Sequence, residues 1–177
     1  TTPVPTPIPE PEPEPKPAVL IPPEAVQSLY GYMVRESDGA VTLDKNSTDL
    51  IYPASMTKIM TALVAAENLT DLDEKILMTS EIIDPLYLAE ASLAGFCAGE
   101  SPTVRDLLYG AMLPSGGDAC MALAVRVAGS EEAFTEIMNQ RAAQMGLTGT
   151  HFTNVSGLHD PDHYSTCRDM ALLLQNA

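Results

Sequence analysis

The pattern of apolar and polar residues predicts a β-hairpin near the start of the chain. Ser28–Arg35 reads Ser-Leu-Tyr-Gly-Tyr-Met-Val-Arg, which is rich in strand-forming residues. The turn-forming sequence Glu36-Ser37-Asp38-Gly39 follows it, and Ala40–Leu43 then returns to apolar residues. Two short apolar runs joined by such a turn are typical of two antiparallel strands.

The rest of the chain has mostly helical patterns. A helix is expected from Ser55 to about Asn68, because its apolar residues recur at helical spacing. Thr103 with Asp106, and Thr166 with Asp169, have the spacing of capping boxes. Ile76–Ser80 is expected as a short strand or extended link, and 150–164 as irregular. The other expected helices are Leu86–Leu93 after a break at Pro85, Thr103–Leu113, Asp118–Ala128, Ser130 to Gly146, and Thr166 to the C-terminus.

This order of elements favours a mixed α/β domain of which only part is present. One hairpin supplies too few strands for a stable sheet. The last helix carries Leu172-Leu173-Leu174, with no later element to cover these leucines. The alternative is a small, mostly helical domain that is complete as it stands.

The chain begins with a proline-rich segment, which we take as a linker over residues 1–24 before a domain over 25–177. Every second residue from Pro3 to Pro17 is proline. Such a run forms neither helix nor ladder, so an extended polyproline-type spacer is expected. A spacer of this kind suits a domain held away from a membrane or cell wall. The alternative is an unstructured end of no functional consequence.

Composition excludes several functions. The formal net charge of −15 argues against nucleic-acid binding, and no apolar run is long enough to span a bilayer. Cys97, Cys120 and Cys167 lack the spacing of a zinc or disulfide framework. We expect them to be small buried residues. The sequence predicts no metal site and no cofactor.

The first group of residues with chemical potential is Ser55 and Lys58 in Pro53-Ala54-Ser55-Met56-Thr57-Lys58. Residues three apart lie on one face of a helix. A desolvated lysine amine can accept the proton of a serine hydroxyl and so make it a nucleophile. The free N–H groups at a helix start also favour negative charge there. The alternative is an N-cap serine beside a solvated lysine.

The second group is Leu113-Pro114-Ser115-Gly116-Gly117-Asp118, which places Ser115 in a turn between two helices. The glycines allow positive φ or close approach of the backbone, as a substrate-facing loop requires. The alternative is an ordinary helix–helix turn.

Together these residues resemble the serine D-alanyl-D-alanine carboxypeptidases, the low-molecular-mass penicillin-binding proteins of bacterial cell-wall maturation. The resemblance runs from about Val26 to Ala177. It implies that 25–177 is the amino-terminal part of a D,D-peptidase domain, with the penicillin-binding-protein/β-lactamase-like transpeptidase fold reduced to a hairpin and a helical lobe. The matching stretches are Pro53–Thr61, Asp106–Gly110, Leu113–Gly116, Thr150–Asn154, Gly157-Leu158 and His163–Thr166.

The resemblance also implies a mechanism. Ser55 would attack the penultimate D-alanine carbonyl of a peptidoglycan stem peptide, Lys58 would take its proton, and water would clear the acyl-enzyme. Ser115 would relay a proton to the leaving amine, and Gly116 and Gly117 would face the substrate. β-Lactams would acylate the same serine. Such an enzyme works outside the cytoplasm, in the cell envelope, and its association with the membrane or wall would be peripheral or anchored.

Two departures from the family pattern matter. Gly117 stands where the family usually has asparagine, so an amide that would hold the lysine and the substrate is missing. The K-T-G motif is absent too, since the nearest string is Leu147-Thr148-Gly149. In the family this motif lies on a strand that follows the helical region. We therefore expect this 177-residue piece to be weak or inactive, and the parent protein to be active.

Three other readings stay open. A zinc D,D-peptidase is suggested by His159 and His163 with His151 nearby, but Pro161 argues against the helix that such a pair needs. A class A β-lactamase needs a glutamate in its omega-shaped loop, and residues 150–164 contain none. A wall-binding pseudoenzyme that retains the fold without turnover is supported by Gly117.

Overall fold

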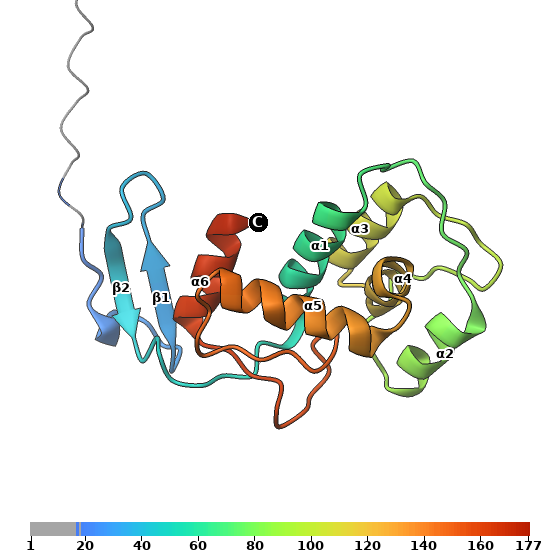
Figure 1. Ribbon diagram of the computed structural model, residues 1–177. Helices are drawn as coiled ribbons and strands as arrows, with labels where there is room; N and C mark the ends of the chain where they lie inside the picture. Colours follow the sequence, from blue (N-terminus) through green and yellow to red (C-terminus); the bar gives the residue numbers. More distant parts are fainter. Residues whose placement is uncertain (1–16, 18) are drawn as a thin grey trace, which may run out of the picture.

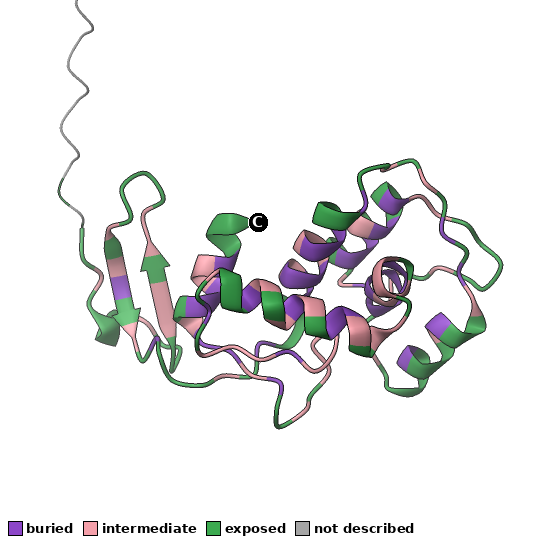
Figure 2. Ribbon diagram, viewed as in Figure 1, coloured by how far each residue is buried: buried purple, intermediate pink, exposed green. Residues whose placement is uncertain are grey.

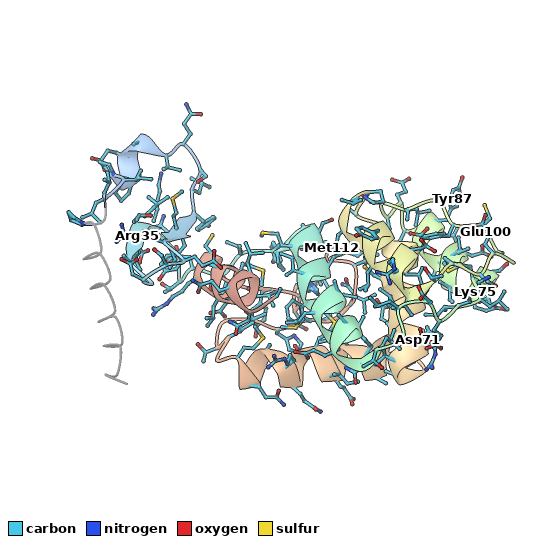
Figure 3. The ribbon with its side chains drawn as sticks, turned by 90° about the horizontal axis from the view of Figure 1, so that it is seen from above. Arg35, Asp71, Lys75, Tyr87, Glu100 and Met112 are labelled. Atoms are coloured by element: carbon cyan, nitrogen blue, oxygen red, sulfur yellow. The ribbon has the colours of Figure 1, made fainter. Side chains whose placement is uncertain are left out.

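The computed structural model describes residue 17 and residues 19–177. The hairpin lies at one end of the molecule and a lobe of helices at the other, with α6 (Cys167–Asn176) between them (Figure 1). Arg35 in the hairpin is therefore far from Lys75 and Glu100 at the opposite end (Figure 3). Most of the linker expected over 1–24, namely residues 1–16 and 18, lies outside the described residues.

The predicted hairpin is present. Strand β1 (Gly31–Val34) pairs antiparallel with β2 (Val41–Lys45). In the turn, the Asp38 carboxylate forms an ion pair with Arg35 and accepts the Ala40 N–H, while Gly39 has a φ of +69°. These interactions fix the reversal that the turn sequence predicted.

The residues just before position 25 pack onto this hairpin. Ile21 N donates to Thr42 O on β2 at 2.8 Å, and Pro23–Ala25 forms a 3-10 turn. The division of the chain at residue 24 stays a prediction.

The helical lobe is built around α4, which lies among its neighbours α1, α2, α3 and α5 (Figure 1). Small residues along α4 are fully buried, and the inward faces of α1 and α3 are buried as well (Figure 2). Small side chains on the central helix let its neighbours approach closely. The helices are α1 (Thr57–Asn68), α2 (Ser80–Leu88), α3 (Val104–Met112), α4 (Gly117–Ala128) and α5 (Glu131–Gln144).

Several predicted helix ends are confirmed. Thr103 and Asp106 form a full capping box at α3, and the Ser130 side chain caps α5. Gly129 ends α4 with a φ of +85°. At α6 the prediction is half right, because Thr166 accepts the Asp169 N–H but the Asp169 carboxylate binds Gly149 N and Thr150 Oγ1 instead.

The helix break expected at Pro85 is wrong. Pro85 lies inside α2, which begins at Ser80 and ends at Leu88. The proline removes only the bond to the Glu81 carbonyl, one turn earlier, and both residues are exposed. A short surface helix whose Ile82 and Leu86 are buried tolerates that loss.

The expectation for the cysteines is partly wrong. All three are free, but only Cys120 is buried, whereas Cys97 is exposed and Cys167 is half-buried.

The final helix is better covered than its sequence suggested. Leu173 is fully buried and α6 packs against β1, although Leu174 remains 64% exposed. Within the part of the chain that the structure describes, no helix is long and apolar enough to cross a membrane.

Candidate active site

Ser55 lies in a single 3-10 turn, Ala54–Met56, that leads directly into α1. The segment before it is fixed by two backbone bonds between Ile51 and Ser165. Ala54 has a φ of +48°, a strained value for a residue with a side chain. Ser55 is therefore not the N-cap of α1, which was the alternative that the sequence left open. It is an exposed residue on a strained turn in front of the helix.

Lys58 is buried on the first turn of α1, with 4% of its surface exposed. Its Nζ lies 3.2 Å from Ser55 Oγ and 2.5 Å from the backbone oxygen of Ser156. Burial lowers the pKa of Lys58, which favours the neutral amine that a proton acceptor requires. The neighbouring Cys120 thiol, whose own pKa is raised to about 12 by burial, has the opposite and smaller effect on the pKa of Lys58.

The Ser156 carbonyl belongs to the irregular segment 150–164, which is ordered against α1. Three side chains of α1 bind this segment. Thr57 bonds to the His163 ring, Lys58 to Ser156 O, and Thr61 donates to Val155 O at 2.8 Å. Phe152 and Val155 reach into the core. The predicted irregular segment is confirmed, and it forms one wall beside Ser55.

His163 ties this segment to α1 as a neutral ring. Its Nδ1 accepts the Thr153 N–H at 3.1 Å, so its Nε2 carries the proton and donates to Thr57 Oγ1 at 2.7 Å. Burial lowers the pKa of His163 to about 4. His163 is therefore an ordered loop residue that binds nearby backbone.

The histidines suggested for zinc do not converge. Both ring nitrogens of His163 are engaged, His151 Nδ1 lies 2.6 Å from Asp162 O, and His159 contacts the edge of the Tyr52 ring. Among the described residues no group of three metal-ligating side chains is found.

The closest approach in the site is between Gly157 and the turn that carries Ser55. A Cβ at residue 157 would lie 1.9 Å from Ala54 O and 3.0 Å from Ser55 N. Gly157 also has a φ of +84°. Glycine is therefore required at this position, both for its conformation and for the close approach of its backbone.

Ser115 lies in the turn between α3 and α4, half-buried and with a φ of +61°. Its hydroxyl oxygen is buried and has no hydrogen-bond partner among the described residues. A strained serine with an unused hydroxyl is typical of functional sites, where such strain is retained.

Gly116 and Gly117 are both buried, and the structure gives each a reason in packing. A Cβ at Gly116 would lie 2.6 Å from Ala94 Cβ and 2.7 Å from Gly110 O, so only glycine fits. At Gly117 a Cβ would lie 3.3 Å from Ser92 O, which is tight but open to adjustment. That either glycine contacts substrate stays a prediction.

Asp118 is a residue of this region that sequence reasoning missed. It is fully buried, and its carboxylate accepts the N–H groups of Ala94, Gly95 and Phe96 at 2.7, 3.0 and 3.2 Å. It thereby holds the segment against which Gly116 packs. Its place next to Gly117 at the start of a helix was visible in the sequence, but its distant partners were not.

Asn154 was also missed. Its side chain binds the backbone of residues 156–158, the turn that presents the Ser156 oxygen to Lys58. Asparagine followed closely by serine and glycine is a turn signal that could have drawn attention to it.

The chain matches known proteins over almost all of its described length. The family model described as D-alanyl-D-alanine carboxypeptidase matches residues 22–177. D-alanyl-D-alanine carboxypeptidase DacF of Bacillus subtilis is 38% identical over 143 residues, and DacC of Escherichia coli is 40% identical over 145. The chain covers 36% of each of these relatives, so it spans about a third of their length.

Solved structures agree with this match. The crystal structure of the Streptomyces K15 DD-transpeptidase gives a TM-score of 0.80 at 33% identity, covering 91% of this chain and 62% of that one. Penicillin-binding protein 5 of Haemophilus influenzae gives 0.77 at 31% identity, covering 82% of this chain and 43% of that one. The predicted fold, a hairpin and helical lobe of the penicillin-binding-protein type, is thus confirmed.

Proposed function

Because this chain belongs to the peptidase S11 family of D-alanyl-D-alanine carboxypeptidases, we propose that its protein is a serine D-alanyl-D-alanine carboxypeptidase with Ser55 as nucleophile. The substrate would be a peptidoglycan stem peptide ending in D-Ala-D-Ala, and the site of action the cell envelope outside the cytoplasm. The single observation that carries the proposal is the 3.2 Å contact between Lys58 Nζ and Ser55 Oγ on a strained turn.

Lys58 is the proton acceptor in this mechanism. Burial lowers its pKa, so the neutral amine needed to deprotonate Ser55 is more accessible than in a solvated lysine. The Ser55 oxygen attacks the penultimate D-alanine carbonyl, the peptide bond breaks, and terminal D-alanine leaves with the proton. Water then attacks the ester carbonyl, which releases the shortened peptide and returns a proton to Ser55.

Ser115 is proposed to relay the proton between Lys58 and the leaving amine. Its buried hydroxyl without a partner is suited to that role, because it can donate to and accept from groups brought by a substrate. The Ser55 N–H would be one oxyanion donor, since the first N–H groups of a helical turn lack partners within it. Gly116 and Gly117 would shape the wall behind Ser115.

β-Lactams are proposed to acylate the same serine, which provides a direct test. We would incubate the full-length gene product with benzylpenicillin and measure intact mass over time, with Ser55→Ala, Lys58→Ala and Ser101→Ala beside it. Ser101 is an exposed serine that serves as the matched control. The expected result is one adduct of the mass of the drug in the wild type and in Ser101→Ala, absent in Ser55→Ala and strongly slowed in Lys58→Ala.

The other readings give different outcomes. A folded protein that binds peptidoglycan but forms no adduct would favour the pseudoenzyme that Gly117 suggests. Rapid hydrolysis of the drug without a lasting adduct would favour a β-lactamase. Activity lost to a chelator would favour a metal enzyme. Release of D-alanine from a D-Ala-D-Ala peptide, dependent on Ser55, would support the proposed reaction itself.

A further inference from the structure

The turn 154–158 presents the carbonyl group that contacts Lys58. The Ser156 oxygen accepts from Lys58 Nζ at 2.5 Å, across 98 positions in the sequence. Because Ser156 and Lys58 are both buried, water does not readily replace this bond. The position of one backbone oxygen therefore helps to set where the amine lies relative to Ser55.

One side chain fixes that oxygen. Asn154 Oδ1 accepts the N–H groups of Ser156, Gly157 and Leu158 at 3.2, 2.7 and 3.1 Å. Asn154 Nδ2 donates to Leu158 O at 2.8 Å, which closes the turn from its other end. With both ends of its amide in use, Asn154 determines the direction in which the Ser156 carbonyl points.

The rest of the segment is held by other groups. Val155 N donates to Glu131 Oε1 at 3.0 Å, and Val155 O accepts from Thr61 at 2.8 Å. Phe152 is held by both ends of the Asn139 amide at 2.8 Å. Removal of the Asn154 amide should therefore loosen residues 156–158 and leave the segment docked on the lobe.

We infer that Asn154 is a positioning residue, which acts through the Ser156 carbonyl to hold Lys58 at the distance from Ser55 that acylation requires. This inference rests on the proposed function, in which Lys58 takes the proton of Ser55. Asn154 lies outside the two serine-containing motifs, yet it would affect the rate of acylation. A displacement of about 1 Å in a reacting group can cost a factor of about 10² in rate.

The test compares three variants of the full-length gene product. Asn154→Ala removes the whole amide. Asn154→Asp retains an oxygen that accepts the three N–H groups. Asn139→Ala removes an amide with equivalent bonds to the same segment, at Phe152 instead of beside Lys58. Stopped-flow measurement with a fluorescent penicillin separates the rate constant of acylation from the dissociation constant of the non-covalent complex.

We expect Asn154→Ala to lower the acylation rate constant about 10- to 100-fold with little change in the dissociation constant. Asn154→Asp and Asn139→Ala should stay within about threefold of the wild type. Wild-type acylation in Asn154→Ala would overturn the inference. An equal loss in Asn139→Ala would do so as well, because it would point to general loosening of the segment. An equal loss in Asn154→Asp would also overturn it, because the oxygen that accepts the three N–H groups would then not be what fixes the Ser156 carbonyl.

A second readout does not depend on activity. The ¹³Cε resonance of Lys58, assigned by its loss in Lys58→Ala, reports the surroundings of the amine in any folded form of the protein. It should move in Asn154→Ala and stay near its wild-type position in Asn154→Asp and Asn139→Ala. If the wild type were never acylated, the proposed function would fail, and this resonance would still decide for or against the role of Asn154.

Discussion

Gly157 faces Ala54 so closely that a Cβ on residue 157 would come within 1.9 Å of the Ala54 carbonyl oxygen. The turn that carries Ser55 and the segment that carries the Ser156 carbonyl are thus in direct backbone contact. The shape of the candidate site therefore depends on glycine at position 157, because any side chain there would collide with Ala54.

Gly157→Ala tests this contact, and Gly129→Ala is its matched control. The two glycines have φ values of +84° and +85°, but nothing lies within 4 Å of a Cβ at Gly129. Gly129→Ala should lower the free energy of unfolding by about 1–2 kcal/mol, from backbone strain alone. Gly157→Ala should lower it by about 1–3 kcal/mol more, because the turn at Ala54 must move.

Denaturant unfolding measures both variants, and penicillin acylation measures the effect on Ser55. Acylation should fall about 100-fold in Gly157→Ala and remain unchanged in Gly129→Ala. If both variants lost the same unfolding free energy, the added methyl group at residue 157 would have no steric cost against Ala54.

The buried His163 side chain should make the stability of the protein depend on pH. Burial lowers its pKa in the folded protein to about 4, whereas a free histidine titrates near 6.5. Between these values the unfolded chain binds more protons than the folded one, so this contribution is complete above about pH 6.5 and declines as the pH falls toward 4. Over the full range it amounts to as much as about 3 kcal/mol.

The measurement is the free energy of unfolding between pH 4 and pH 7.5 for the wild type, His163→Gln and His159→Gln. We expect His163→Gln to be less stable at neutral pH and to have a smaller decline toward pH 4. His159 is exposed, so His159→Gln should follow the wild-type curve in shape. If the unfolding free energy of His163→Gln declined with falling pH as steeply as that of the wild type, His163 would not be the source of the pH dependence.

Local rules predicted much of the fold. The turn around Asp38 and Gly39 gave the hairpin, and the cap residues Thr103 and Ser130 gave the starts of two helices. Ser55 and Lys58 could be paired because residues three apart on a helical turn lie on the same face by geometry alone. These features depend on positions close together in the chain.

The features that were missed depend on distant partners. Lys58 meets Ser156 across 98 positions, and the Asp118 carboxylate binds N–H groups more than twenty positions earlier. No periodicity encodes such contacts, because they arise only when the helices pack. Pro85 was misjudged for a related reason, since the burial of Leu86 and Ile82 outweighed the lost backbone bond.

Asp118 is expected to be a main support of the wall that contains Ser115. Asp118→Asn would set an amide against N–H donors and leave part of them unsatisfied in a buried site, a loss of about 2–3 kcal/mol in unfolding free energy. Hydrogen exchange should rise at Ala94 to Phe96, whose N–H groups the carboxylate accepts.

Asp106→Asn is the control for this change, because Asp106 is an exposed carboxylate that also accepts backbone and hydroxyl donors. Its replacement should cost less than about 1 kcal/mol and leave exchange at residues 94–96 unchanged. If the two variants lost the same stability, burial of Asp118 would not be the cause.

Gly117 stands where the second motif expected of the family usually has asparagine. Gly117 and Cys120 are three apart on α4 and so share a face of that helix. Cys120 is a neighbour of Lys58, since the charge of Lys58 acts on the pKa of its thiol. A Cβ at residue 117 would itself lie against Ser92, Leu86 and Ala91, so the family pattern is the reason to expect that an amide there reaches the lysine.

We expect Gly117→Asn to acylate faster than Gly117→Ala by about tenfold or more, because an amide that binds Lys58 or the substrate can contribute a factor of about 10²–10³. Both variants add the same Cβ, 3.3 Å from Ser92 O, so both share the steric cost of that contact. Their ratio therefore reports the net effect of the amide group beyond the Cβ. A ratio near one would mean that the Ser156 carbonyl already fixes Lys58 well enough, and that glycine at 117 is compensated by the turn Asn154 organises.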